Sequence, residues 1–177
     1  ALAALVILYV YFAIFGRRFL SPSTFVSILD SSYYIGFLAI GMTFVIITSG
    51  IDLSAGTVMV GAALLGGVAY NVWHLPILVC LLVVVGTGLL FGVGNGVLVG
   101  FLRLPPFIAT LGMQFISLGL CAVAAKVQTQ TYPSLTSPDG WFKTVLYKAG
   151  TFPVGALWLA GFFAIAWFIL NRTKLGR

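Results

Sequence analysis

An acidic residue between two apolar stretches is the first candidate for chemistry in this sequence. Asp52 is one of only three acidic residues, with Gly50 before it and Ser54 after it. One interpretation is a backbone break at membrane depth, where Asp52 or Ser54 caps the next helix by accepting hydrogen bonds from its free amide groups. The positive end of that helix would then face a transport path. The alternative is a capped turn at the membrane surface, and Asp30 is read as a similar cap or surface residue.

Two side-chain amides lie inside later apolar stretches, Asn95 and Gln114. Each is expected to hydrogen-bond to a neighbouring helix, and contact with a polar substrate is the alternative, because polar groups inside membranes are often functional. Four glycines at intervals of four residues accompany Asn95 and predict a helix-packing surface, with a smooth pathway wall as the alternative. This glycine ladder comprises Gly88, Gly92, Gly96 and Gly100.

Residues that commonly carry catalysis or bind metals are isolated here. His74 is the only histidine and stands in a predicted turn, about 25 to 30 Å from Asp52 if the intervening residues are helical. Cys80 and Cys121 each lie in an apolar stretch, so neither a disulfide nor a metal site is indicated. The sequence has no GxxxxGK[ST] phosphate loop, so we expect no cofactor in this chain. Transport is therefore favoured over an intramembrane transferase that uses His74 and Asp52.

Long apolar helices must position these side chains. The chain has 177 residues, of which 61% are hydrophobic and 7% charged, whereas soluble domains carry roughly 25% charged residues. Because a spanning helix needs roughly 20 apolar residues, we predict an all-α integral membrane protein, a bundle of about six transmembrane helices with broken or Gly/Pro-interrupted junctions. The spans are expected at residues 1–16, 25–48, 54–70, 77–101, 107–125 and 152–170.

The net charge of +6 comes from nine basic residues against three acidic ones. The basic residues stand between the apolar stretches instead of forming one basic face. They indicate charges that flank a lipid bilayer, and nucleic-acid binding is not expected. Their two-sided distribution leaves the orientation open, although charge density favours a cytoplasmic position for the Arg103 loop and the C-terminal tail.

Three segments resemble the inner-membrane permeases of ABC importers of the ribose, arabinose, xylose and galactose type. They are residues 41–56 (GMTFVIITSGIDLSAG), 103–112 (RLPPFIATLG) and 171–177 (NRTKLGR), in the order in which that family has them. Ser49 and Ala55 stand where the family more often has glycine and valine. The resemblance implies that residues 1–177 are a single transmembrane domain, the N-terminal portion of a longer permease, with a cytoplasmic tail.

The resemblance also implies a function, partners and a site. The permease would pass a monosaccharide or similar polyhydroxyl solute from a periplasmic sugar-binding protein across the bacterial cytoplasmic membrane. A separate ABC ATPase would bind ATP, and a second permease subunit would complete a homo- or heterodimer. The implied substrate pathway comprises Gly50, Asp52 and Ser54, with Thr43, Phe44, Asn95 and Gln114 as weaker candidates. An ion-coupled secondary transporter or channel is the competing interpretation, in which Asp52 takes part in coupling.

Overall fold

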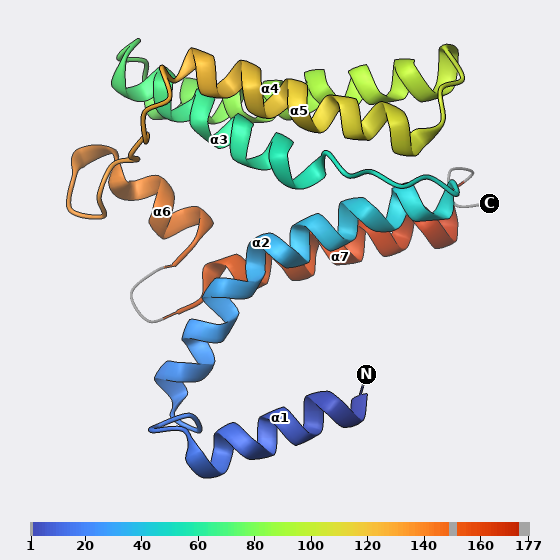
Figure 1. Ribbon diagram of the computed structural model, residues 1–177. Coiled ribbons are helices and arrows are strands. Elements are labelled where there is room, and N and C mark those ends of the chain that lie inside the picture. Colours follow the sequence, from blue (N-terminus) through green and yellow to red (C-terminus); the bar gives the residue numbers. More distant parts are fainter. Residues whose placement is uncertain (1, 149–151, 174–177) are drawn as a thin grey trace. The chain divides into compact units, whose positions relative to one another are not determined.

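The computed structural model describes residues 2–148 and 152–173, and within these ranges the chain is helical with no β-strand (Figure 1). This confirms the all-α prediction. The helices are α1 (Leu2–Phe15), α2 (Pro22–Ile47), α3 (Ala55–Asn71), α4 (Ile77–Gly96), the π-helix η1 (Val97–Phe101), α5 (Pro106–Ala124), the 3-10 helix η2 (Pro138–Gly140), α6 (Trp141–Leu146) and α7 (Val154–Arg172). Two compact units divide the chain, residues 38–142 and residues 1–37 with 143–177, and each is described by itself.

Within the described residues, four helices are long and apolar enough to cross a membrane: α2, α4 together with η1, α5 and α7. The apolar helices α1 and α3 are shorter, with 14 and 17 residues. A helix of 17 residues is about 25 Å long, less than the roughly 30 Å of the hydrocarbon core. The structure therefore agrees with a multi-pass membrane chain, while six complete spans stay a prediction. Between α2 and α3 the backbone leaves the helix over residues 48–54, which we name the break.

In the unit of residues 38–142, α3 packs against both α4 and α5. The contact uses small residues, because Gly61, Ala62, Gly66 and Gly67 of α3 are all buried. A Cβ atom added at Gly61 would lie 2.8 Å from Cys121 Sγ on α5. Small side chains let helix backbones approach closely where no water drives association. The close helix contacts therefore lie on α3, where the sequence analysis did not place them.

The glycine ladder of α4 behaves differently from these α3 glycines. A Cβ atom added at any ladder glycine would meet no other atom of the described residues within 4 Å. Gly94, which lies between two ladder glycines, does approach a neighbouring helix, since a Cβ atom added there would be 2.9 Å from Met113 Cε on α5. The ladder is thus no contact surface inside the described part of this chain, and its packing against another helix stays a prediction.

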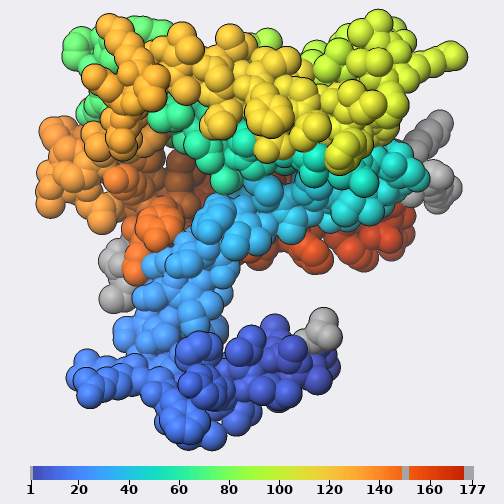
Figure 2. Space-filling model, viewed as in Figure 1, coloured from blue at the N-terminus to red at the C-terminus, as the bar shows by residue number. Residues whose placement is uncertain are grey.

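Apolar side chains cover the outer surface of the unit. On α5, which runs from yellow to orange in Figure 2, Phe115 is 67% exposed and Val123 is 73% exposed. Such exposure would be costly in water, where burial of apolar area stabilises a fold by about 25 cal/mol per Å². Contact with lipid chains removes that cost, so these surfaces fit the multi-pass membrane chain indicated by composition.

The segment after α5 is ordered against α3 instead of extending freely into water. The Tyr132 hydroxyl donates a hydrogen bond of 2.7 Å to the carbonyl oxygen of Ala63. The Tyr70 hydroxyl donates one of 3.0 Å to Asp139 Oδ2. Partial burial raises the pKa of the Tyr132 phenol above its usual value. A small core of Ala69, Ile77, Cys80 and Phe142 lies beneath this segment.

In the unit of residues 1–37 and 143–177, the first part of α2 lies beside α7 (Figure 1). The rings of Phe37 and Phe162 meet edge to face, with centroids 5.4 Å apart. Asp30 lies inside α2, and its side chain is only 10% exposed. Its Oδ2 forms an ion pair with Lys148 Nζ at a distance of 2.7 Å. Its interpretation as a cap or surface residue is therefore wrong, because the partner that stabilises its charge comes from a distant part of the chain.

Replacing Lys148 with methionine is expected to destabilise the protein by about 2 kcal/mol. The change leaves the Asp30 carboxylate buried without a counter-ion, which costs about 3–5 kcal/mol for a fully buried pair and less here, because Lys148 is 30% exposed. Thermal unfolding of the purified full-length protein measures the loss. The double variant Lys148→Met/Asp30→Asn is the control and should recover most of the stability. Equal instability of the single and double variants would contradict a role for the ion pair.

Candidate functional site

The break begins where α2 ends in a Schellman motif. The Gly50 amide donates to the carbonyl oxygen of Val45 at 3.0 Å, and the Ser49 amide donates to that of Ile46 at 2.9 Å. Ser49 has a φ of 59°, in the left-handed region that such motifs require. Glycine is the usual residue at this position because a Cβ atom is strained there. The motif turns the chain out of α2 toward Asp52.

Ser49→Gly is expected to stabilise the protein by about 0.5–1 kcal/mol, because it removes the steric cost of a left-handed non-glycine residue. Part of that gain is offset by the greater freedom of glycine in the unfolded chain. Thermal unfolding of the full-length protein tests the prediction. The matched control is Ser27→Gly within α2, which should destabilise. A lower melting temperature for Ser49→Gly than for the parent would overturn the role assigned to Ser49.

Asp52 organises the other end of the break. Its Oδ1 accepts a 2.8 Å hydrogen bond from the Ser54 amide and a 2.6 Å bond from the Ser54 hydroxyl. The first closes an Asx turn directly before α3. The Ser54 side chain caps no helix amide, although Ser54 is the N-cap residue. Of the two expected cap residues, Asp52 accepts a hydrogen bond from an amide at the start of α3, whereas the Ser54 side chain does not, because its hydroxyl donates to Asp52.

Asn95 joins this turn to a second helix. Its Nδ2 on α4 donates a 2.8 Å hydrogen bond to Ser54 Oγ, which is fully buried. A bond between helices is what the sequence analysis expected of Asn95. Asp52, Ser54 and Asn95 thus form one chain of hydrogen bonds across the break, which we name the break network.

Helix α5 holds the break from another side. The Thr110 hydroxyl donates to the carbonyl oxygen of Ile51 at 3.1 Å and also contacts that of Pro106 at 2.8 Å. Ser117 Oγ donates to Thr57 Oγ1 at 3.1 Å, and Thr57 donates to the Ser54 carbonyl oxygen at 2.8 Å. These hydroxyls belong to α3 and α5 and fix the start of α3 against its neighbour.

The positions of these partners show how deep the break lies in its unit. Asn95 precedes the end of η1 at Phe101 by six residues, and Thr110 follows the start of α5 at Pro106 by four. At 1.5 Å per residue the break therefore lies about 6–9 Å inside the end of η1, which continues α4, and the start of α5. Irregular backbone at this depth is tolerated only where protein or a water-filled cavity surrounds it.

The remaining predicted pathway residues lie apart from the break network. The Thr43 hydroxyl bonds within α2, to the carbonyl oxygen of Ala39 at 2.8 Å. Phe44 follows it on α2 and is half-buried. Gln114 on α5 is half-buried, and its carbonyl oxygen accepts a bond from Ser117 at 3.1 Å. The structure thus brings Gly50, Asp52, Ser54 and Asn95 to the break, whereas the pathway roles of Thr43, Phe44 and Gln114 stay predictions.

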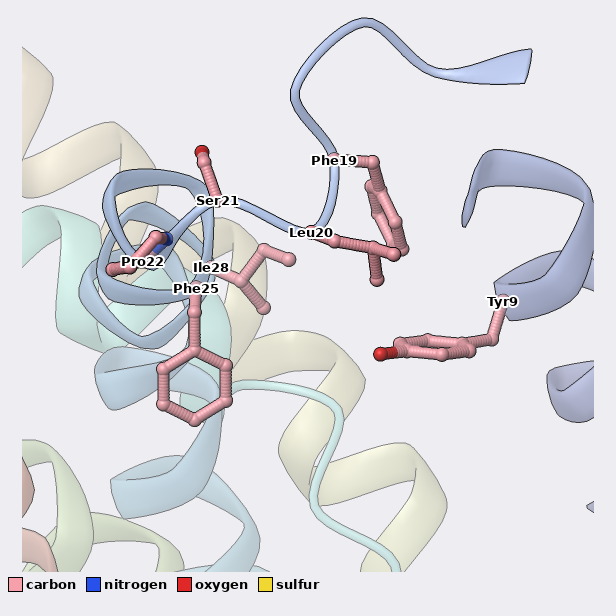
Figure 3. A pocket seen from close by; sticks show the side chains of 7 residues that line it. All are labelled: Tyr9, Phe19, Leu20, Ser21, Pro22, Phe25 and Ile28. Carbon is pink, nitrogen blue, oxygen red and sulfur yellow. The ribbon is translucent and has the colours of Figure 1, made fainter. Parts of the chain in front are cut away.

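Two pockets elsewhere are weaker candidates for a polar substrate. Figure 3 shows the first, between α1 and α2, with a volume of about 270 Å³. Its lining is mostly apolar and comprises Tyr9, Phe19, Leu20, Ser21, Pro22, Phe25 and Ile28. The second, of about 400 Å³, lies beside α3 and is lined by Met59, Val60, Ala63, Leu64, Gln130 and Tyr132. Neither contains a predicted pathway residue, so the break is the better candidate site.

Comparison with known proteins identifies the chain. Residues 24–177 match the protein family described as "Branched-chain amino acid transport system / permease component". The chain belongs to this permease family. Since the family consists of transport components, the expectation of a transport subunit instead of an enzyme is confirmed. No solved structure matches the chain.

Several relatives of this permease are named for sugars. It is 37% identical to a galactofuranose transporter permease protein of Escherichia coli (strain K12), over 91% of this chain and 45% of the relative. It is 32% identical to a fructose import permease protein of Rhizobium meliloti, over 93% and 47%, and 32% identical to a ribose import permease protein of Escherichia coli (strain K12), over 100% and 55%. The chain spans about half the length of these relatives. The resemblance to sugar-importer permeases is confirmed.

The motifs of the permease coincide with the elements that build the site. Residues 41–56 cover the end of α2, the break and the start of α3. Residues 103–112 cover the start of α5, including Thr110. The sequence analysis missed Thr110 as a site residue, although it stands in this second motif. The third motif, residues 171–177, ends α7 at Arg172, and residues 174–177 lie outside the described part.

Proposed function

We propose that this permease chain forms part of the membrane-spanning subunit of an ATP-driven importer of a monosaccharide or similar polyhydroxyl solute. The observation that carries the proposal is the break, a polar, hydrogen-bonded interruption about 6–9 Å inside the ends of its neighbouring helices. Polar groups at such depth are expensive unless they serve binding or transport. The names of the relatives, for galactofuranose, fructose and ribose, support a sugar as cargo.

The proposed pathway passes the break. Gly50, Asp52, Ser54 and Asn95 would form its polar wall, and Thr43, Phe44 and Gln114 would line it further along. Sugars are bound by a few converging hydrogen-bonding groups beside apolar or aromatic surface. The hydroxyl and amide groups of the break are of this kind. They would shape a passage for the solute, and tight binding is not required of them.

The proposed partners follow from the family. A separate ABC ATPase would bind and hydrolyse ATP, so that this chain itself needs no cofactor. A periplasmic sugar-binding protein would deliver the solute, and a second permease subunit would complete the translocation path. The chain would reside in the bacterial cytoplasmic membrane, as one transmembrane domain of a longer subunit, with residues 171–177 on the cytoplasmic side.

Uptake by membrane vesicles tests this proposal. The vesicles contain the full-length subunit, its ATPase and its binding protein, and D-ribose, D-fructose and D-galactose are offered with and without ATP. We expect ATP-dependent uptake of at least one sugar, which stops when the ATPase is omitted. Uptake that ignores ATP and collapses with an ionophore would contradict the proposal and favour an ion-coupled transporter.

A further inference from the structure

Within the described part of the chain, the Nδ2 atom of the Asn95 side chain has a hydrogen-bond partner, whereas its Oδ1 atom has none. Nδ2 donates to Ser54 Oγ, and the hydrogen of that hydroxyl goes to Asp52 Oδ1. A hydroxyl has a single hydrogen, so Ser54 has none left for Asn95 and the amide must turn its NH₂ group toward Ser54. Asn95 Oδ1 is left buried, without a hydrogen-bond donor in the described part of the chain.

The hydroxyl groups on the helices beside the break, those of Thr57, Thr110 and Ser117, donate elsewhere. Thr57 donates to the carbonyl oxygen of Ser54, and Ser117 donates to Thr57. The single hydroxyl hydrogen of Thr110 is shared between the carbonyl oxygens of Pro106, at 2.8 Å, and Ile51, at 3.1 Å. Asp52 as a carboxylate can only accept. Because buried polar atoms are nearly always paired, the unpaired oxygen indicates that a donor from outside this network belongs there.

We infer that Asn95 Oδ1 accepts a hydrogen bond from a hydroxyl group of the transported solute as it passes the break. Asn95 is then the residue that touches the substrate, and Asp52 is a positioning residue that acts through Ser54. This inference rests on the proposed function and deepens it, because it names the chemical group that is recognised. The ligand class is a polyhydroxyl compound, since a hydroxyl group supplies the hydrogen that this oxygen lacks and a carboxylate does not.

Irregular backbone lies on both sides of Asn95 Oδ1, and its movement would expose this oxygen. Asn95 Oδ1 is covered as described here, so a solute reaches it only when the groups that cover this oxygen move. Residues 48–54 lie outside the helices on one side of it. On the other side, the π-helix η1 starts two residues after Asn95, at Val97. Single π-turns often mark functional sites in helices. Movement of these irregular segments would give the solute access while α3 and α5 stay packed.

Recognition of a hydroxyl has a consequence for selectivity. A site built to bond one hydroxyl rejects an analogue that lacks it, because the buried group of the protein is then left unpaired. The test is ATP-driven uptake by vesicles that contain the full-length subunit, its ATPase and its binding protein. The probes are whichever of D-ribose, D-fructose and D-galactose the wild type takes up fastest, together with the monodeoxy analogues of that sugar.

We expect Asn95→Leu to lower uptake of the parent sugar about tenfold while leaving uptake of one deoxy analogue unchanged, so that discrimination against that analogue disappears. The same binding protein serves the wild-type and the variant permease. A change in the ratio of uptake rates between the parent sugar and its analogue is therefore due to the permease. If Asn95→Leu does not fold, Asn95→Gln is tested in its place. Glutamine keeps the amide but places it one methylene further from the backbone, so this variant should weaken the same discrimination.

Two control variants separate contact from positioning. Ser54→Ala removes the tether of Asn95 but keeps the amide, so it should weaken the same discrimination, and to a smaller degree than Asn95→Leu does. Thr87→Val removes a buried hydroxyl that bonds only within α4, and it should change neither rate nor ratio. An equal fall for parent and all analogues in the Asn95 variants would overturn the inference. The proposed function fails separately, through wild-type uptake that needs no ATP.

Discussion

Asp52→Ala in the full-length subunit is expected to reduce sugar uptake by about tenfold to a hundredfold. The substitution removes the acceptor of two hydrogen bonds, from the amide and the hydroxyl of Ser54. A bond to a charged group contributes about 1.5–3 kcal/mol; at about tenfold in rate for each 1.4 kcal/mol, the expected fall corresponds to the energy of one such bond. Initial uptake rates, normalised to the amount of folded protein, measure the effect. Normal uptake would reduce Asp52 to a dispensable cap.

Asp52→Asn separates positioning from ion coupling. Asparagine keeps an oxygen where Asp52 Oδ1 accepts both bonds but carries no charge. If Asp52 acts by holding Ser54 and Asn95 in place, uptake by this variant stays within about threefold of wild type, since weaker neutral bonds replace the charged ones. Loss as complete as in Asp52→Ala, together with wild-type uptake that collapses with an ionophore, would favour the ion-coupled alternative.

Gly61→Val is expected to destabilise the protein by about 3 kcal/mol. An added Cβ atom at Gly61 would lie 2.8 Å from Cys121 Sγ, 3.2 Å from Cys121 Cβ and 3.4 Å from the carbonyl oxygen of Ser117. Overpacking of a tight interface costs about 1–3 kcal/mol, and the upper end applies because valine adds two further methyl groups. The melting temperature of the purified full-length protein reports the loss.

Gly119→Val is the matched control for Gly61→Val. Gly119 lies on α5, where an added Cβ atom meets no atom of the described residues within 4 Å. The same chemical change there should alter stability by about 0.5 kcal/mol or less. If Gly61→Val is as stable as this control, the close approach of α3 and α5 is wrong.

Local signals in the sequence predicted much of the site. The short junction around Asp52 and Ser54 marked the break, because both residue types bond to nearby backbone amides. The predicted span limits lie within three residues of the observed helices, since long apolar runs and prolines define helix ends in such a chain. Asn95 was identified as a bond between helices because an amide in an apolar helix needs a partner.

Contacts between residues that are distant in the sequence could not be predicted from the sequence alone. Nothing in the local pattern distinguishes Gly61 from the ladder glycines, because which helix face meets a neighbour depends on the whole bundle. The ion pair of Asp30 joins residues 118 positions apart, so no local pattern could reveal it. The Ser54 hydroxyl bonds to Asp52 and Asn95 because α4 packs beside the start of α3, and a single sequence does not specify that packing.

The most direct test of the central claim, that the break lies on the transport path, is the reactivity of a cysteine placed there. Gly56 lies in the first turn of α3, and an added Cβ atom meets nothing within 4 Å among the described residues. The native Cys80 and Cys121 are buried, and the full-length protein without the substitution is labelled in parallel to measure the background. The full-length Gly56→Cys variant is treated with a small hydrophilic maleimide during ATP-driven uptake, with and without the transported sugar. We predict that the thiol is labelled and that the sugar slows the labelling. A thiol that stays unlabelled while uptake is normal, or that reacts at one rate with and without sugar, would contradict the account.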